Sequence, residues 1–420
     1  MLDIGYIREN PKKVKKGSKD KGYKVDVDHI LELDEKYRNA LQDTESLRAK
    51  RNEISTKLSR DMDSNTREKH LKEAEGIKRD LKDSESFLKE VLEELDKAMR
   101  KVPNMPFDDV PVGKDDSENV VLRYEGEKPK FDFKAKDYLD IAEQWDLIDM
   151  ERAAKVAGSR FGYLKNQVAQ LEFALVRFAM DMLTEEGFSP VVPPVLIRSE
   201  FMRKLGYLDT REDEDEIYYL EKDDMYLVGT SEQSIVPMHA DETLNEKDLP
   251  LRYAGFSTCF RREAGSYGKD TRGILRVHQF DKIEMVSFSH PERSRDEHKF
   301  LLSMQEKLMK ALEVPYQVVH ICTGDTGFPM AEKFDIESWI PSEDKYRETH
   351  STSNATDFQA RRLNTRFKGK DKGYVHILNG TAFAIGRTLI AIIENHQNED
   401  GTVTVPKALQ KYTGFKRIGS

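Results

Sequence analysis

Cysteine is scarce in this chain: only Cys259 and Cys322 occur among 420 residues, far apart and without a CxxC spacing. The sequence therefore supports neither a disulfide framework nor a thiolate zinc site, and we expect a reducing, cytoplasmic setting and no zinc. Long apolar runs are also missing, so we expect no signal peptide and no membrane-spanning helix. The GxxxxGKS/T and GxGxxG patterns are absent too, which argues against the P-loop and dinucleotide-binding modes.

Positive charge is not in excess either, because 68 lysines and arginines face 77 acidic residues, for a net charge of −9. This balance argues against a general nucleic-acid binder held by bulk electrostatics, so any RNA contact has to be local. One local excess exists, since residues 1–24 hold Arg8 and seven lysines against three acids. The length of the chain favours two or three structural units.

Two apolar seams with alternating spacings of three and four predict an antiparallel helical hairpin over about residues 28–102. A polar stretch separates the seams, and Asn65 with Glu68 resembles a capping box there. Each helix would be roughly 50 Å long, too long for a compact domain to cover, so we expect a solvent-exposed arm. A dimerisation coiled coil and a device that contacts a large partner both remain open. The second seam is read at positions 71, 74, 78, 81, 85, 88, 92, 95, 99 and 102.

The rest of the chain has a different pattern. Residues 103–130, rich in proline and acids, are interpreted as a linker, and we predict domains at 1–110 and 111–420. Closely spaced strand-like runs, several without an intervening helix, favour an α+β fold with an antiparallel sheet and helices packed on it. The predicted helices are 137–157, 164–186 and 291–312. The predicted strands are 188–197, 251–263, 274–289, 315–323 and 374–385.

The runs 251–263 and 274–289 contain the densest group of unusual residues. Because side chains alternate along a strand, Arg261 and Glu263 share one face of the first run. A hairpin of the two runs would gather arginine for a phosphate, a carboxylate for an exocyclic amine and Phe280 for stacking on a base. A solvated sheet face with ion pairs is the alternative. On the second run the same parity groups Arg276, His278, Phe280, Lys282 and Glu284.

Two further groups could carry chemistry. Arg387 follows the turn at Gly386 and falls in the first turn of a predicted helix, where a cation runs against the helix dipole. It is therefore a candidate for facing an anion, or else an ordinary surface arginine. Glu348 and Ser351 flank His350 and offer the oxygen ligands that Mg²⁺ prefers, although polar clusters are common in loops. His350 itself is interpreted as structural.

Several motifs together resemble one family, the seryl-tRNA synthetases, over almost the whole chain and in the expected order. Residues 260–266 with 276–280 are similar to motif 2 of that family, and residues 379–387 to its motif 3. Residues 187–194 resemble motif 1, the dimer-interface element of class II synthetases. Thr230-Ser-Glu232 resembles the serine-binding TxE signature of the family.

The resemblance implies an ATP-dependent serine–tRNA ligase, a homodimer that uses Mg²⁺ and loads tRNA-Ser, and tRNA-Sec where present. It also implies that the hairpin reaches the long variable arm of tRNA-Ser. Residues implied in ATP binding are Arg261, Arg262, Glu263, Val277, Phe280, Glu348, Thr349, His350, Ser351 and Arg387. Those implied in serine binding are Thr230, Ser231, Glu232, Glu284, Asn379 and Thr381. The implied catalytic residues are Arg261, Arg387 and Glu348, and the implied Mg²⁺ ligands are Glu348 and Ser351.

Some positions depart from the usual family pattern: His350 and Thr381 stand where serine is frequent, and Phe383 is bulkier than the usual leucine. These departures affect the fine shape of the expected pockets. A ligase that loads an amino acid onto a carrier protein is one alternative, but such paralogues lack the N-terminal arm. A catalytically dead, RNA-binding paralogue is another, and the residues whose loss would signal it are all present: Arg261, Glu263, Glu348 and Arg387.

Overall fold

The computed structural model describes residues 1–61, 63–208, 215–264 and 272–419. The chain divides into two compact units, Met1–Pro103 and Asn104–Ser420. Across the described parts, no helix is both long and apolar enough to cross a membrane. Most of the loop predicted between the two motif 2 strands, residues 265–271, lies outside the described residues.

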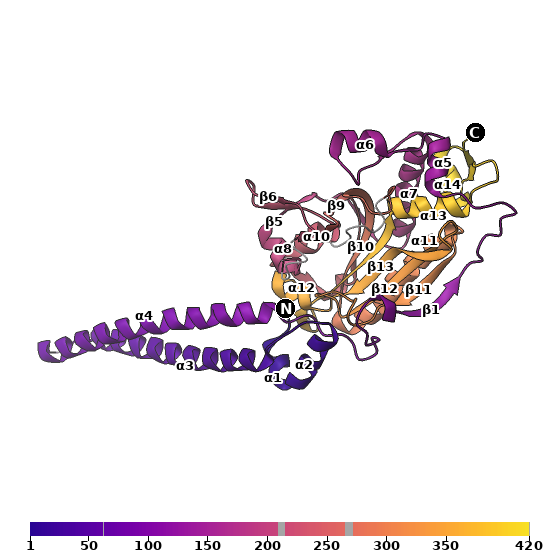
Figure 1. Cartoon of the computed structure of the whole chain (residues 1–420). Coiled ribbons are helices and arrows are strands. Elements are labelled where there is room, and N and C mark those ends of the chain that lie inside the picture. Colours follow the sequence, from indigo (N-terminus) through magenta and orange to yellow (C-terminus); the bar gives the residue numbers. More distant parts are fainter. Residues whose placement is uncertain (62, 209–214, 265–271, 420) are drawn as a thin grey trace. The chain divides into compact units, whose positions relative to one another are not determined.

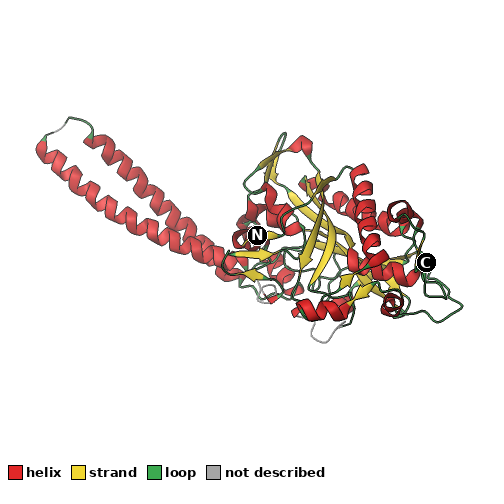
Figure 2. Ribbon diagram, turned by 90° about the horizontal axis from the view of Figure 1, so that it is seen from above, coloured by secondary structure: helices red, strands yellow, loops and turns green. Residues whose placement is uncertain are grey.

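The first unit is built on two long helices that run side by side as an antiparallel pair (Figures 1 and 2), so the predicted hairpin is confirmed. Asp63, rather than the predicted Asn65, caps the second helix, because its carboxylate accepts the backbone N–H of Thr66 at 2.9 Å. Residue 62 of the turn lies outside the described residues. The helices of this unit are α1 (Ile4–Glu9), α2 (Pro11–Asp20), α3 (Val27–Leu58) and α4 (Ser64–Arg100).

The buried seam of α4 differs in part from the predicted one. Its spacing of three and four is as expected, but Ile77 and Val91 are buried in place of Lys78 and Leu92. Both the predicted and the observed seam include Leu81. The ammonium group of Lys78 prefers solvent, so the seam that buries Ile77 in its place is the one that forms. At mid-length the hydroxyl groups of Thr44 and Ser84 meet at 2.7 Å across the helix pair.

The second unit contains an eight-stranded sheet in the order β1-β11-β12-β13-β16-β10-β9-β4. All neighbouring strands are antiparallel except β4 and β9, which confirms the predicted α+β fold with a largely antiparallel sheet. The strands are β1 (Val120–Glu125), β4 (Ser189–Val191), β9 (Leu251–Phe260), β10 (Gln279–Ser289), β11 (Tyr316–His320), β12 (Glu332–Ile340), β13 (Lys345–Asn354) and β16 (His376–Ala384).

Helices cover one face of this sheet and form the main core with it (Figure 1). Alternation along β10 shows the two faces: Ile283 and Met285 enter the main core, whereas Val286 and Phe288 enter a second apolar cluster on the opposite face. The main-core helices are α5 (Tyr138–Gln144), α7 (Asn166–Glu185), α11 (Ser294–Ala311), α13 (Ile385–Asn395) and α14 (Lys407–Thr413). Those at the second cluster are α8 (Ser199–Leu205), α10 (Glu232–Ile235) and α12 (Phe358–Leu363).

Short elements complete the unit. They are α6 (Met150–Ala157), the pair β2 (Ile148–Asp149) and β3 (Tyr163–Leu164), the pair β17 (Val403–Thr404) and β18 (Arg417–Ile418), the set β5 (Leu196–Arg198), β6 (Tyr219–Leu220) and β7 (Met225–Leu227), and the set β8 (Thr243–Asn245), β14 (Arg366–Lys368) and β15 (Lys372–Tyr374).

Further sequence-based assignments were wrong. The predicted helix 137–157 is interrupted by β2, and the predicted strand 188–197 is divided between β4 and β5. The predicted linker 103–130 contains β1, which pairs with β11 at the sheet edge. Glu348 and Ser351 lie on β13, a central strand, and not in a loop. The sequence of β13 is polar on both faces, which is typical of loops. In the structure one of these two faces lines a cavity.

Candidate active site

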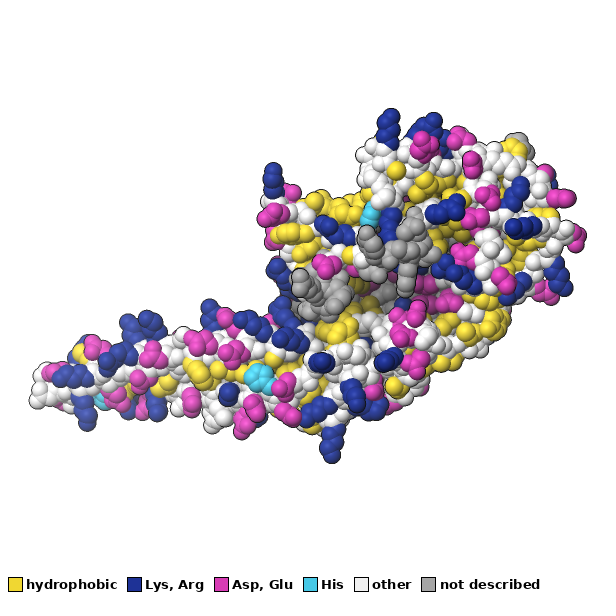
Figure 3. All heavy atoms as spheres, viewed as in Figure 1, with side chains coloured by type: hydrophobic (Ala, Val, Ile, Leu, Met, Phe, Trp, Pro, Cys, Tyr) yellow, Lys and Arg dark blue, Asp and Glu magenta, His cyan; other side chains and the backbone are white. Residues whose placement is uncertain are grey.

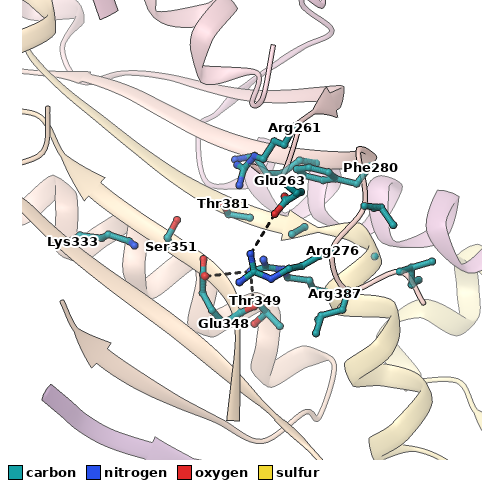
Figure 4. A pocket seen from close by; sticks show the side chains of 16 residues that line it. Arg261, Glu263, Arg276, Phe280, Lys333, Glu348, Thr349, Ser351, Thr381 and Arg387 are labelled. Atoms are coloured by element: carbon teal, nitrogen blue, oxygen red, sulfur yellow. Dashed lines mark hydrogen bonds and ion pairs between the residues drawn. The ribbon is translucent and has the colours of Figure 1, made fainter. Parts of the chain in front are cut away.

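A cavity of about 320 Å³ opens on the sheet face opposite the main core, where the ends of β10, β13 and β16 meet the start of α13 (Figure 4). The structure brings together here most of the residues predicted to bind ATP: Arg261, Glu263, Val277, Phe280, Glu348, Thr349, Ser351 and Arg387. The sheet, the connection between β9 and β10, and the start of α13 together bring in residues from three separate parts of the sequence.

The other two predicted ATP residues lie elsewhere, since neither belongs to the described lining of this cavity. Arg262 donates through Nε to the carbonyl of Ile217 at 3.0 Å. His350 is buried against Phe383, with ring centroids 5.8 Å apart. Burial lowers the pKa of His350 to about 4, so this histidine is neutral near pH 7.

One end of the cavity holds an aromatic ring beside two ion-pairing residues (Figure 4). The guanidinium of Arg261 lies 5.3 Å from the centroid of the Phe280 ring. Arg276 donates through Nη1 to Glu263 at 3.3 Å. Glu263 has a φ of +53°, a strained backbone conformation for a non-glycine residue, which is found most often at functional sites. This end offers a flat apolar face, a carboxylate and cations within one space.

The other end of the cavity holds an arginine paired with a carboxylate. Arg387 reaches the Glu348 carboxylate at 3.3 Å and donates to its backbone carbonyl at 2.9 Å. Desolvation acts against ionisation, but the positive charges of Arg387, Lys333 and Arg261 lower the pKa of Glu348 to about 2. Glu348 is therefore ionised at any physiological pH.

The oxygen donors at this end fit a hard divalent cation. Glu348 and Ser351 both line the cavity from β13. Asp335 lies directly opposite Ser351 in the ladder of β12 and β13, and its buried Oδ1 lacks a hydrogen-bond partner among the described residues. Carboxylate and hydroxyl oxygens beside a phosphate site suit Mg²⁺, which keeps several waters and shares substrate oxygens.

A second cavity of about 570 Å³ adjoins the first. Arg261, Lys282 and Lys333 line both cavities, so the junction between them is cationic. Four of the residues predicted for serine line the second cavity: Thr230, Glu232, Glu284 and Asn379. Thr381, also predicted for serine, lines the first cavity at the same junction.

The floor of the second cavity carries paired polar groups. Glu284 receives the Lys282 ammonium at 2.5 Å and the Thr381 hydroxyl at 3.3 Å. Asn379 presents a buried Nδ2 that has no hydrogen-bond partner among the described residues. A buried donor without a partner is costly unless a ligand satisfies it, so this amide is suited to meet a polar substrate atom.

Ser231 does not belong to the described lining of either cavity. Its hydroxyl donates to the carbonyl of Gly255 on β9 at 3.3 Å and so anchors the turn that carries Thr230 and Glu232. Gly255 is needed for this approach, because a Cβ built there would lie 2.8 Å from the Ser231 hydroxyl.

Sequence reasoning assigned no role to three cations at the junction: Arg276, Lys282 and Lys333. Strand parity placed Lys282 on the correct face, whereas Arg276 precedes β10, which begins at Gln279 and not at the predicted position 274. Lys333 lies on β12, a strand that the sequence did not reveal. Desolvation opposes its charge, but Asp335, Glu348 and Asp325 raise the pKa of Lys333, so it stays cationic.

Two family models match this chain. The tRNA synthetase class II core domain (G, H, P, S and T) matches residues 217–396, and the seryl-tRNA synthetase N-terminal domain matches residues 1–106. Curated relatives named serine–tRNA ligase include proteins of Dictyoglomus turgidum, 45% identical, and Rubrobacter xylanophilus, 42% identical. Each match covers 100% of this chain and 99% of the relative.

Two solved structures are similar over the whole chain. The seryl-tRNA synthetase of Pyrococcus horikoshii complexed with ATP has a TM-score of 0.92 at 42% identity, covering 100% of this chain and 99% of that one. The cytoplasmic serine–tRNA ligase of Naegleria fowleri in complex with AMP has a TM-score of 0.89 at 33% identity, covering 100% and 98%.

Proposed function

This chain belongs to the seryl-tRNA synthetase family, and we propose that it activates L-serine with ATP and transfers the serine to the 3′ end of tRNA-Ser. The observation that carries this function is the junction of two cavities at Arg261. One cavity has the groups for a nucleotide and the other has the groups for a small polar amino acid. A phosphate held at Arg261 therefore lies next to the substrate that attacks it.

In the activation step the serine carboxylate attacks the α-phosphorus of ATP, and pyrophosphate leaves with the bonding electrons. The substrate supplies the nucleophile, so the enzyme contributes alignment and charge stabilisation. Arg261 binds the α-phosphate and Phe280 stacks on the adenine. Glu263 accepts a hydrogen bond from the exocyclic amine of the adenine. Arg387 binds the γ-phosphate. In this scheme Arg387 exchanges its contact with Glu348 for a contact with ATP.

Glu348 and Ser351 would hold Mg²⁺ together with ATP. The bound ion would neutralise phosphate charge and so favour departure of pyrophosphate. Two observations support this Mg²⁺ site: the hard oxygen donors that β13 places in the cavity, and a pKa of Glu348 low enough to keep it ionised.

Specificity for serine follows from the second cavity. Glu284 and Thr381, with Asn379 nearby, read the substrate hydroxyl, whereas Thr230 and Glu232 receive the amino group. Alanine lacks the hydroxyl and would leave these buried groups unpaired, which discriminates strongly against it. Threonine has the hydroxyl and has to be excluded by the space for its methyl group.

The test is ATP–pyrophosphate exchange with serine, threonine, alanine and glycine run side by side. Exchange stimulated by serine, and far less by the others, supports the proposal. Arg261→Ala should abolish it, and the matched control Arg262→Ala, which changes a neighbouring arginine outside both cavities, should retain most of it. Absence of exchange in folded wild-type protein would instead favour a non-catalytic, RNA-binding paralogue.

We assign tRNA binding to the helical hairpin, and extend this to tRNA-Sec where that tRNA is present. Lysines, arginines and acids alternate along its surface (Figure 3), so a tRNA contact has to use particular residues rather than a net field. Thr44 and Ser84 face each other, so residues 46–82 can be replaced by a short turn that joins the helices at that level. This variant should keep serine-dependent exchange but form little seryl-tRNA.

We also propose that the protein is a cytoplasmic homodimer. Phe173 on α7 and Val192 after β4 are 72% and 81% exposed, and Val192 belongs to the segment 187–194 that resembles motif 1. Exposed apolar side chains beside an edge strand are suited to an interface. Val192→Glu should shift sedimentation towards the monomer. Val112→Glu, at a position that is 65% exposed elsewhere, is the control. Both cysteines are free and buried, which suits a reducing compartment.

A further inference from the structure

Glu232 is held by two donors that come from different parts of the fold. It begins α10, is 3% exposed and lines the second cavity. Its Oε1 accepts the side-chain amide of Gln359 at 3.2 Å, and its Oε2 accepts the hydroxyl of Tyr207 at 3.1 Å. With one donor on each oxygen, the carboxylate is fixed in one orientation, and both oxygens keep room for a further donor.

Gln359 occupies a position that would suit an apolar residue. It lies on α12, is 0% exposed, and its neighbour Ala360 packs into the second apolar cluster. Among the described residues its Oε1 has no hydrogen-bond partner, so the amide is only half satisfied. Burial of an amide costs free energy unless its hydrogen bonds are made. The bond to Glu232 is therefore the interaction that accounts for a glutamine at this position.

The donors to Glu232 are neutral, and this distinguishes it from the neighbouring carboxylate. Glu284 forms an ion pair with Lys282, which offsets its charge. Glu232 has no ion-pair partner among the described residues, because an amide and a hydroxyl hold it. In its ionised form it therefore presents to the cavity a negative charge that no ion pair among the described residues offsets, which is the group that an ammonium ion requires.

We propose that Gln359 and Tyr207 are positioning residues for amino-acid recognition, which fix Glu232 for the substrate ammonium group without neutralising it. The inference rests on the proposed function, because the ammonium group is that of serine. It adds the two residues that orient Glu232, neither of which the proposed function assigns. Gln359 acts through Glu232, since it does not belong to the described lining of either cavity.

The first test is Gln359→Met, which keeps the length of the side chain and removes its donor. In serine-dependent ATP–pyrophosphate exchange, loss of a hydrogen bond to a charged group should raise KM for serine about tenfold or more. KM for ATP should stay within about twofold, because the first cavity is unchanged. Tyr207→Phe removes a single oxygen and should shift KM for serine in the same direction. Tyr207 itself lines the second cavity, so this variant supports the proposal only together with the ligand pair described below, which is measured on it if Gln359→Met fails to fold.

A pair of ligands separates positioning from general packing. Seryl-sulfamoyl-adenosine mimics the adenylate, and its 3-hydroxypropanoyl counterpart lacks only the amino group. Gln359→Met should weaken the first about tenfold and leave the second unchanged, so that the preference for the amino group falls by the same factor. Equal weakening of both ligands would show a merely structural role and overturn the proposal.

Failure of this proposal can be told apart from failure of the proposed function. Wild-type protein without serine-dependent exchange would remove the proposed function and the inference with it. Active wild-type protein, together with an unchanged KM for serine in both Gln359→Met and Tyr207→Phe, would remove the inference alone. A large rise in KM for ATP would likewise contradict it, since Glu232 does not line the ATP cavity.

Discussion

Arg387 and Glu348 form an ion pair: the guanidinium lies 3.3 Å from the carboxylate and also donates to the backbone carbonyl of Glu348. Both groups are assigned to ATP, one to the γ-phosphate and one to Mg²⁺. The ion pair therefore keeps two opposite charges oriented at the end of the cavity that is proposed to bind the phosphates.

Arg387→Ala should lower kcat/KM for ATP in pyrophosphate exchange by about 10²–10³, because it removes a charge aimed at the leaving group. Arg387→Lys should restore only part of this, since an ammonium group cannot reproduce the two-pronged geometry of a guanidinium. The measurement is exchange kinetics at varied ATP. An alanine variant with normal ATP kinetics would contradict the assignment of Arg387.

Glu348→Gln should raise the Mg²⁺ concentration that gives half-maximal exchange, because an amide is a weaker ligand than a carboxylate with a pKa of about 2. Titration of Mg²⁺ at fixed ATP checks this. Glu337→Gln is a suitable control, since this residue lies opposite Glu348 in the ladder but lines neither cavity in its described part. Equal Mg²⁺ requirements in both variants would exclude Glu348 as a ligand.

Thr381→Val should weaken serine recognition while keeping the shape of the side chain. The hydroxyl of Thr381 donates to Glu284 at 3.3 Å, and its loss removes one donor from a buried carboxylate. We expect kcat/KM for serine to fall about 10- to 100-fold, corresponding to roughly 1.5–3 kcal/mol. Discrimination against alanine should fall with it, as measured by exchange with both amino acids. Retained discrimination would show that Thr381 does not take part in hydroxyl recognition.

The sequence predicted the hairpin, the antiparallel sheet and many of the residues that line the first cavity. Apolar seams report packing directly. The predicted strand 251–263 ends at Phe260, so Arg261 and Glu263 enter the cavity from the loop after β9 and not through strand alternation. β13 could not be found from an apolar pattern, because a strand that lines a polar cavity lacks the apolar alternation that marks other strands. Its neighbour β12, which carries Lys333, was missed with it.

The positioning residues at the serine end were also beyond a reading of the sequence. Gln359 and Glu232 are 127 positions apart, and their hydrogen bond exists only because α12 and α10 both contribute to the second apolar cluster. His350 shows the converse. The family resemblance implied ATP binding for it, but strand alternation turns its ring into the core, in agreement with its interpretation as a structural residue.

Serine binding should depend on pH through Glu232. Burial, and then the charge of Glu284, raise the pKa of Glu232 from 4.5 to about 7. The ionised form binds an ammonium group, so KM for serine should rise by up to about tenfold per pH unit below 7. Stability has the opposite sign: a folded-state pKa above the unfolded value means that the ligand-free protein loses stability as pH rises from about 4.5 to 7. Glu232→Gln should remove this part of the pH dependence of Tm, and an unchanged profile would contradict the assignment.

Two glycine substitutions of opposite sign test how tightly the serine-binding turn is packed. A Cβ at Gly255 would lie 2.8 Å from the Ser231 hydroxyl and even closer to the Ile235 side chain, so Gly255→Ala should cost about 1–3 kcal/mol of unfolding free energy. It should also raise KM for serine, because the displaced turn carries Glu232. Gly76→Ala in α4 meets nothing within 4 Å and should stabilise the hairpin by about 1 kcal/mol.

Thermal unfolding and pyrophosphate exchange of the two variants check both directions. Gly76→Ala is the matched control, since it adds the same methyl group in the hairpin and should leave exchange unchanged. If Gly255→Ala lowered stability but left KM for serine at its wild-type value, the turn would tolerate displacement. Glu232 would then be positioned by Gln359 and Tyr207 alone, because their bonds to its carboxylate do not depend on the contact of Ser231 with β9.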